Sequence, residues 1–257
     1  ARDLAASGTP MCFPGRRTGE RFGPGDPAWL LAYRVGLYGH GIGPQGGEGY
    51  PLAVLAYTGG PAGRTAALQR YWRQLRPVVP GRDGLLVSNT WGDRSRDERI
   101  CEAFLVGELT AGERLGVDVV QIDDGWQQGR TSNSARPGGV WEGYWQGDAG
   151  FWSPDPQRFP NGLAPLVDAA RGRGLNLGLW FAPDSADEFA NWRRDADCIL
   201  RLHRELGVSH FKIDAVKLCS KQSEANLRRF VEAVLAESDG RVVFDMDVTA
   251  QARPGYF

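Results

Sequence analysis

From residue 84 to residue 247, short apolar runs alternate with amphipathic segments, and this alternation restricts the fold more than any other feature of the sequence. Apolar runs bounded by turn residues predict buried strands, and apolar residues spaced at i, i+3 and i+4 predict helices. Strands are predicted at 85–91, 117–123, 175–181, 208–214 and 241–247, and helices at 96–115, 163–173, 188–206 and 223–237. Because strands alternate with helices, we expect an α/β fold with a parallel sheet covered by helices.

Two architectures share this order of elements, a closed (β/α)8 barrel of the TIM type and an open doubly wound sheet. A dinucleotide-binding sheet would carry a GxGxxG turn after its first strand, but residues 92–97 read Gly-Asp-Arg-Ser-Arg-Asp. Acidic and aromatic residues stand instead at the C-terminal strand ends, where barrel enzymes keep their active sites. They are Trp91, Asp123, Trp180, Phe181, Asp214, Asp245 and Asp247. The sequence therefore predicts a TIM-type barrel.

The barrel is expected to be incomplete in this chain. A full barrel takes about 250 residues, and five predicted strands leave closure short by roughly three βα units. Further sequence of a longer enzyme, or another chain, would supply them. Residues 1–63 are rich in Gly and Pro with β-like runs such as 50–57, which indicates the end of a β-rich domain. Residues 64–80 contain an amphipathic linker helix over 64–76 that ends before Pro77, and residues 81–257 form the first part of the barrel.

The composition argues against several classes of partner. The 30 basic and 31 acidic residues are interspersed with a formal net charge of −1, so neither nucleic acid nor an anionic membrane is expected. The longest apolar runs, such as 52–57, are far shorter than the ~20 residues of a membrane-spanning helix. No secretory signal is visible, and four widely spaced cysteines favour a reducing compartment, so a cytoplasmic location is expected.

Three histidines argue against a multi-histidine metal site. Nine tryptophans either form platforms for sugar rings or fill a large core.

The strongest local motif is Asp123-Asp124-Gly125-Trp126, which follows a predicted strand. Two adjacent carboxylates repel each other and need solvation or partners. A ligand rich in hydroxyl donors would supply such partners. The alternative is that Asp124 only caps a turn at Gly125.

A second motif, Phe211-Lys212-Ile213-Asp214, ends the fourth predicted strand. Alternation along a strand places Lys212 and Asp214 on the same side, and a neighbouring ammonium favours the ionised form of a carboxylate. A glycosyl nucleophile has to be ionised, so Asp214 is a candidate for that role. The alternative is a structural ion pair inside the barrel.

Together these motifs resemble the catalytic barrel of melibiase-type α-galactosidases, glycoside hydrolase family 36. The resemblance covers about residues 85–217 and rests on the order and spacing of five motifs. They are Asn89-Thr90-Trp91, Asp123-Asp124-Gly125-Trp126, Phe159-Pro160-Asn161-Gly162-Leu163, Gly178-Leu179-Trp180-Phe181-Ala182-Pro183 and Lys212-Ile213-Asp214. The resemblance also implies that residues 1–63 are the end of an N-terminal β-sandwich-like domain.

The resemblance implies a role for each motif. Asp214 would be the nucleophile, Lys212 would hydrogen-bond the sugar, and Asp123 and Asp124 would bind the galactose hydroxyls O4 and O6. Trp91, Trp126 and Trp180 would shape the pocket, although each could equally be barrel packing. The implied reaction cleaves terminal α-galactosyl residues from oligosaccharides or glycosides with retention and without a metal or other cofactor.

The general acid of the family has no clear counterpart here. Arg253 corresponds to the family's Arg, but no Asp follows it before the chain ends. Either Asp247 or Asp245 serves, since alternate strand positions point the same way, or the acid lies outside this chain, which we prefer. Transfer of α-galactosyl groups, as in raffinose synthases, and a catalytically silent carbohydrate-binding domain remain alternatives, and self-association into a homo-oligomer is left open.

Overall fold

Five parallel strands form one curled sheet in the order β3-β4-β5-β6-β7. The computed structural model describes residues 11–12, 31–32, 55–75, 77–93, 95–218 and 220–247. The chain divides into two units: a smaller unit of residues 40–86, and a larger unit of residues 1–39 and 87–257. The strands are β3 (Val87–Asn89), β4 (Val119–Ile122), β5 (Asn176–Phe181), β6 (His210–Ile213) and β7 (Val243–Met246).

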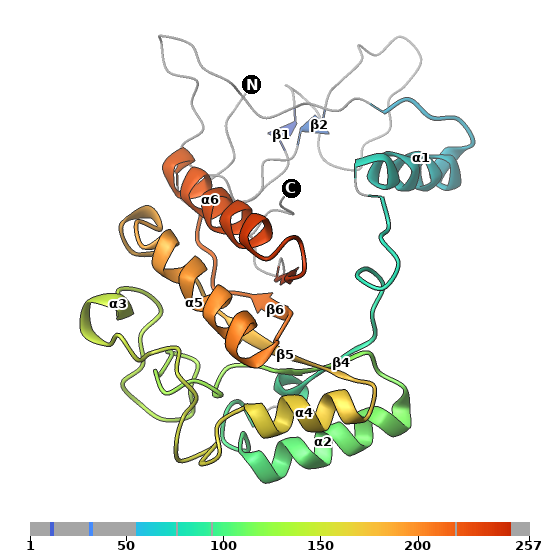
Figure 1. Ribbon diagram of the computed structural model, residues 1–257. Helices are drawn as coiled ribbons and strands as arrows, with labels where there is room; N and C mark the ends of the chain where they lie inside the picture. The colour runs from blue at the N-terminus through green and yellow to red at the C-terminus, as the bar shows by residue number, and fades with distance from the viewer. Residues whose placement is uncertain are drawn as a thin grey trace. The chain divides into compact units, whose positions relative to one another are not determined.

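Helices connect the strands, and all of them except the short α3 were predicted from the periodicity. They are α2 (Glu102–Leu115), α3 (Tyr144–Gly147), α4 (Ala164–Gly172), α5 (Trp192–Leu206) and α6 (Lys221–Glu237), with short 3-10 turns η2 (Thr90–Asp93) and η3 (Ala186–Glu188). Helix α2 packs beside α4, and α5 packs beside α6 (Figure 1). The larger unit therefore has the predicted α/β order and a sheet consistent with an incomplete barrel.

Two helices begin later than predicted because residues before them adopt a left-handed backbone conformation with positive φ. Arg96 has a φ of 56°, so the predicted helix at 96 begins only at Glu102. Asp187, Glu188 and Phe189 have φ values of 47°, 59° and 60°, which delays α5 to Trp192.

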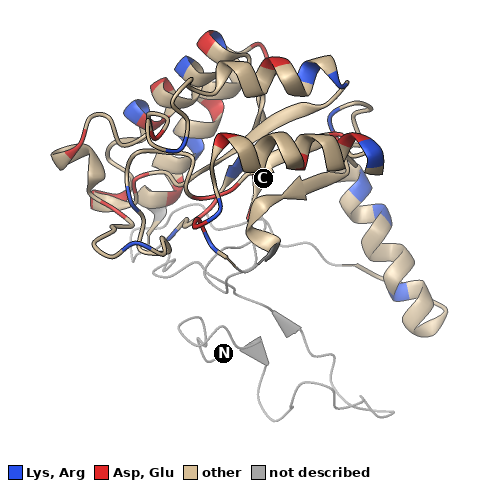
Figure 2. Cartoon of the chain, turned by 90° about the horizontal axis from the view of Figure 1, so that it is seen from below, with Lys and Arg blue, Asp and Glu red and all other residues tan. Residues whose placement is uncertain are grey.

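The smaller unit contains α1 (Gly60–Leu75), which begins four residues before the predicted start at Arg64. Helix α1 carries basic residues and no acidic ones, whereas both signs are interspersed on the helices of the larger unit (Figure 2). Most of the predicted β-like run at 50–57 lies outside the described residues, and residues 55–58 form no strand.

In the first 49 residues the described part is β1 (Met11–Cys12) paired with β2 (Leu31–Ala32), which belongs to the larger unit.

The register of the sheet decides which side chains share its inner face. Trp180 of β5 pairs with Lys212 of β6, and Lys212 pairs with Asp245 of β7. Gln121 of β4 pairs with Asn89 of β3 on the same face. The intervening residues point to the helices and are fully buried, as Phe211 and Ile213 of β6 show. The inner face is therefore polar toward the C-terminal strand ends.

An aromatic cluster supports the C-terminal end of β5. Trp152 lies at its centre, with ring centroids 5.8 Å from Trp126, 5.7 Å from Trp180 and 4.2 Å from Phe181. All four side chains are at most 1% exposed. Such rings fill the core and hold the strand end in one place. No described helix is long and apolar enough to cross a bilayer.

Candidate active site

One ammonium group joins three carboxylates at the C-terminal ends of the strands. Lys212 Nζ lies 2.9 Å from Asp123 Oδ2, 3.8 Å from Asp214 Oδ2 and 3.7 Å from Asp247 Oδ2. The side chains of Lys212, Asp214 and Asp247 are 17%, 15% and 13% exposed, so a ligand can reach them. We call these four residues the Lys212 cluster.

The strands place these groups by their register. Asp214 and Asp247 directly follow the hydrogen-bonded part of β6 and β7, and their backbone N–H groups still extend the ladders. Asp214 N donates to Phe181 O at 3.0 Å, and Asp247 N donates to Ile213 O at 2.9 Å. Parallel strands end at the same edge, so residues far apart in sequence meet here.

Asp214 is oriented by two donors. The Trp180 indole N–H donates to Asp214 Oδ2 at 3.0 Å, and the backbone N–H of Ala215 donates to Oδ1 at 2.5 Å. Ala215 adopts a φ of 55°, a conformation that L-residues rarely take. The backbone turns sharply behind the carboxylate, and that turn aims Ala215 N–H at it.

Charge and burial oppose each other at Lys212. Burial lowers the pKa of Lys212, but the carboxylates of Asp123, Asp214 and Asp247 together raise it above its ordinary value. Lys212 therefore stays protonated at neutral pH, and its positive charge lies beside all three carboxylates.

Asp123 is buried and points into the cluster. Asn89 Nδ2 donates to Asp123 Oδ2 at 2.8 Å and to Gln121 Oε1 at 2.8 Å. Thr90 Oγ1 accepts the Asp123 N–H at 2.9 Å, which fixes the backbone. Sequence reasoning did not select Asn89 as a site residue, although it ends a strand on the same face.

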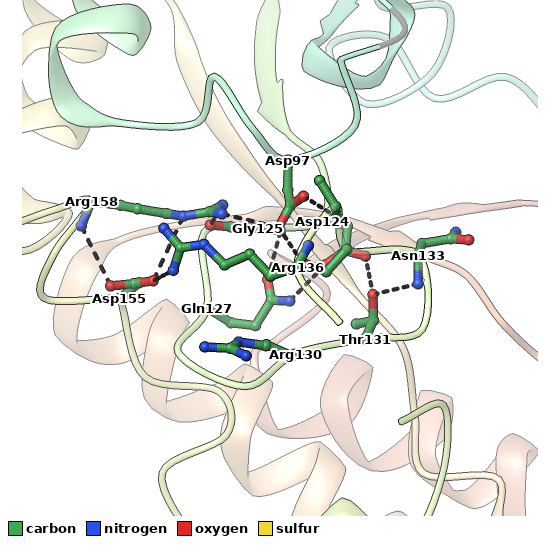
Figure 3. A network of polar contacts seen from close by, with 12 residues as sticks. Asp97, Asp124, Gly125, Gln127, Arg130, Thr131, Asn133, Arg136, Asp155 and Arg158 are labelled. Carbon is green, nitrogen blue, oxygen red and sulfur yellow. Dashed lines mark hydrogen bonds and ion pairs between the residues drawn. The ribbon is translucent and has the colours of Figure 1, made fainter. Parts of the chain in front are cut away.

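Asp124 is bound within the loop that follows it (Figure 3). Gln127 Nε2 donates to Asp124 Oδ1 at 2.7 Å, and the Thr131 hydroxyl donates to Oδ2. The residue is 1% exposed. Burial raises the pKa of Asp124 to about 6, against the hydrogen bonds from Thr131 and Gln127 that lower it. Its predicted contact with a sugar hydroxyl stays a prediction.

Asp124 also lines a polar cavity of about 320 Å³. The buried Arg158 forms part of its wall, donating to Gly125 O at 2.7 Å and to Asp97 Oδ2 at 3.0 Å. A Cβ on Gly125 would lie 2.4 Å from the Asp97 Cβ and from Arg158 NH1, so this turn requires glycine. Asp97 and Arg158 are 61 residues apart, and no local motif links them.

The three predicted tryptophans take different positions. Trp91 is half-buried in η2, and its backbone N–H donates to Asn89 Oδ1 at 2.8 Å. Trp126 and Trp180 are fully buried, and Trp126 Nε1 donates to Trp180 O at 2.8 Å. Trp180 contacts Asp214 directly through its indole N–H, and Trp126 binds the backbone of Trp180. The predicted contact of these two tryptophans with a sugar stays a prediction.

Two further predicted residues can be placed. Asp245 is exposed and pairs in register with Lys212, so it lies on the same face as Asp247. Arg253 lies outside the described residues. The structure thus brings together Asp123, Lys212, Asp214 and Asp247.

A curled parallel β/α sheet with ionisable groups at its C-terminal strand ends is consistent with an incomplete TIM-type barrel. Several known α-galactosidases are similar to this chain. Alpha-galactosidase 2 of Pediococcus pentosaceus is 29% identical over 135 residues, 52% of this chain and 17% of that protein. The α-galactosidase of Escherichia coli is 33% identical over 89 residues, 35% of this chain and 10% of that protein. No family model matches the chain.

The structural comparison gives the same class. An α-galactosidase of Thermus thermophilus in complex with stachyose has a TM-score of 0.50 and 25% identity, covering 70% of this chain and 43% of that one. The same enzyme in complex with p-nitrophenyl α-D-galactopyranoside has a TM-score of 0.51 and 23% identity, covering 85% of this chain and 43% of that one. The resemblance to α-galactosidases predicted from the motifs is confirmed, for a chain that spans less than half of each relative's length.

Proposed function

We propose that this chain forms part of a retaining glycoside hydrolase of the α-galactosidase type, in family 36, which cleaves terminal α-galactosyl residues from oligosaccharides or glycosides. The observation that carries this proposal is the Lys212 cluster, where one ammonium holds Asp123, Asp214 and Asp247 at the strand ends. The α-galactoside complexes of the Thermus thermophilus enzyme support the choice of substrate.

In this mechanism a carboxylate oxygen of Asp214 attacks the anomeric carbon while the glycosidic C–O bond breaks and a general acid protonates the leaving oxygen. The same acid residue, now a base, takes a proton from the water that hydrolyses the glycosyl–enzyme bond and releases Asp214. The ammonium of Lys212 lies 3.8 Å from Asp214 Oδ2, and Trp180 and Ala215 fix the carboxylate orientation. Asp123 accepts hydrogen bonds and would receive those of sugar hydroxyls.

The general acid must carry a proton when the substrate binds. Asp247 Oδ2 forms an ion pair with Lys212 Nζ at 3.7 Å. Its distance from Asp214 Oδ2 is at most the sum of their distances to Nζ, which allows the roughly 5 to 5.5 Å of retaining enzymes. Because Asp247 is already the ion-pair partner of Lys212, we place the acid on a later strand.

A later strand requires a larger barrel. We propose that the five strands are the first part of a (β/α)8 barrel, which about three further βα units close against β3 and β7. Within this proposal residues 1–63 end an N-terminal β-sandwich-like domain, 64–80 form a linker helix and 81–257 begin the barrel. The site would then be enclosed by strands on both sides.

The test compares Asp214→Asn with Asp239→Asn in the complete polypeptide that carries this chain. Asp239 lies in an exposed turn, and its side chain is 85% exposed. We expect Asp214→Asn to lower turnover of an aryl α-galactoside by at least about 10³-fold, with circular dichroism unchanged. Asp239→Asn should be as active as the parent. Activity of Asp214→Asn within about tenfold of the parent would reject the assignment.

Product analysis with excess acceptor sugar separates hydrolysis from transfer, since only a transferase keeps forming glycosides when water is abundant. Calorimetry that shows galactose binding without turnover by the parent protein would favour a silent binding domain.

A further inference from the structure

Two buried carboxylates lie away from the Lys212 cluster. Asp184 follows β5, and Asp195 lies in the first turn of α5; both are 0% exposed. Within the described residues neither forms an ion pair with a Lys, Arg or His. A buried charge without a cation is costly unless N–H and O–H donors surround it. Their hydrogen bonds therefore show what these two residues hold in place.

Asp195 binds two other segments. Trp145 Nε1 donates to Asp195 Oδ1 at 2.7 Å, and Tyr144 Oη lies 3.0 Å from the same oxygen. Asp184 N donates to Asp195 Oδ2 at 3.0 Å. The Asp184 carboxylate in turn accepts the Gly143 N–H at 2.7 Å. We call Asp195, Asp184, Tyr144 and Trp145 the Asp195 clamp, and it joins α3, α5 and the end of β5.

The clamp is continuous with the proposed nucleophile. Tyr144 Oη also donates to Ala182 O at 2.8 Å, and Ala182 directly follows the last residue of β5. That last residue, Phe181, accepts the backbone N–H of Asp214 at 3.0 Å. One residue earlier, Trp180 donates its indole N–H to Asp214 Oδ2. Ala182, which Tyr144 binds, is thus one residue from Phe181 and two residues from Trp180, the two residues of β5 that contact Asp214.

We propose that Asp195 is a positioning residue for the glycosidase: through Tyr144 and Asp184 it fixes the end of β5 and thereby the Trp180–Asp214 hydrogen bond. The proposal rests on the proposed function of Asp214. Asp195 touches no substrate, and it acts through the backbone of residues 180–184. A displaced Trp180 would remove one of the donors that orient the Asp214 carboxylate toward the line of attack.

Proton counting supports a specific role for Tyr144. Its hydroxyl carries one proton, but it lies within hydrogen-bond distance of two acceptors, Ala182 O and Asp195 Oδ1. A proton on Asp195 lets both contacts be hydrogen bonds. Burial raises the pKa of Asp195 to about 7, and the titratable groups that face it are Asp184, Tyr144 and, on α5 itself, Cys198. The link to Ala182 is therefore strongest when Asp195 is protonated.

Tyr144→Phe is the sharpest test, because it removes only the hydroxyl and keeps the ring that stacks on Phe151 at 4.4 Å. Asp195→Asn tests the carboxylate, and Asp197→Asn, on the exposed side of the same helix, is the control. In the complete polypeptide we expect Tyr144→Phe and Asp195→Asn to lower kcat for an aryl α-galactoside by about 10- to 100-fold, with KM within about threefold. Asp197→Asn should leave both constants unchanged.

A second readout does not need activity. The Trp180 indole N–H resonance, assigned with Trp180→Phe, should shift in Tyr144→Phe and Asp195→Asn and not in Asp197→Asn. If Asp195→Asn does not fold, Tyr144→Phe decides alone. A folded Tyr144→Phe protein with unchanged kcat and an unchanged Trp180 resonance overturns the positioning role. A parent protein without turnover rejects the proposed function, and the resonance then decides whether Asp195 positions Trp180.

Discussion

Replacing Lys212 by Met tests the electrostatics of the Lys212 cluster directly. The change keeps most of the apolar stem and removes the charge that Asp123, Asp214 and Asp247 share. At 3.8 Å and an effective dielectric constant of about 20, two unit charges interact by about 4 kcal/mol. Partial exposure of both side chains screens this interaction, so we expect Lys212→Met to lower kcat/KM by about 10- to 100-fold.

The assay is kcat/KM on an activated aryl α-galactoside at neutral pH. Lys217→Met is the matched control, because Lys217 is 51% exposed and pairs with Glu142 at 3.4 Å outside the cluster. Its kcat/KM should match that of the parent. A kcat/KM of Lys212→Met within about twofold of the parent would show that the ammonium does not support the reaction at Asp214.

Three further predictions concern stability and the loop after β4. Trp152→Ala removes the ring at the centre of the aromatic cluster and should lower the free energy of unfolding by about 3 to 5 kcal/mol in urea titrations, and a loss below about 1 kcal/mol would contradict this packing. Because burial raises the pKa of Asp195 to about 7, unfolding releases its proton between about pH 4 and 7; the contribution of Asp195 to stability is therefore full below about pH 4 and is lost as the pH rises through 7, and a parent slope retained in Asp195→Asn would assign it to another group. Asp124→Asn should flatten the corresponding fall of stability between about pH 4 and 6, and an unchanged profile would show that Asp124 does not titrate there.

The sequence predicted the fold where local pattern determines structure. All five strands of the sheet and the helices α2, α4, α5 and α6 between them were expected, because apolar runs and helical spacing are local signals, whereas the short α3 was not predicted. The late starts of α2 and α5 were not predictable, since they depend on left-handed residues such as Arg96 and Phe189 that are neither Gly nor Asn. Tertiary contacts, such as the Glu102 N–H bond to Arg158 O at 3.0 Å, select these starts.

The clusters differ in how far sequence reasoning could reach them. Lys212 lies in β6 and Asp214 directly follows this strand, so the alternation of side chains predicted that both point to the same side of the sheet. Asp195 and Trp145 are 50 residues apart and meet only because α3 packs near the first turn of α5. No local spacing encodes such a contact, so the Asp195 clamp had no signal in a single sequence.

The alternation of side chains along a strand also separates Asp123 from Asp124, although the two are adjacent in the motif. Adjacent residues at a strand end point to opposite sides, so Asp123 and Asp124 cannot both face Lys212. Asp123 joins the Lys212 cluster, and Asp124 turns to Gln127 and Thr131. Asp124 N nevertheless donates to Asp123 Oδ1 at 2.8 Å, so the loop that binds Asp124 also fixes the carboxylate in the cluster. The conformation of the loop after β4 is therefore coupled to the arrangement of charges in the Lys212 cluster through the hydrogen bond between Asp124 N and Asp123 Oδ1.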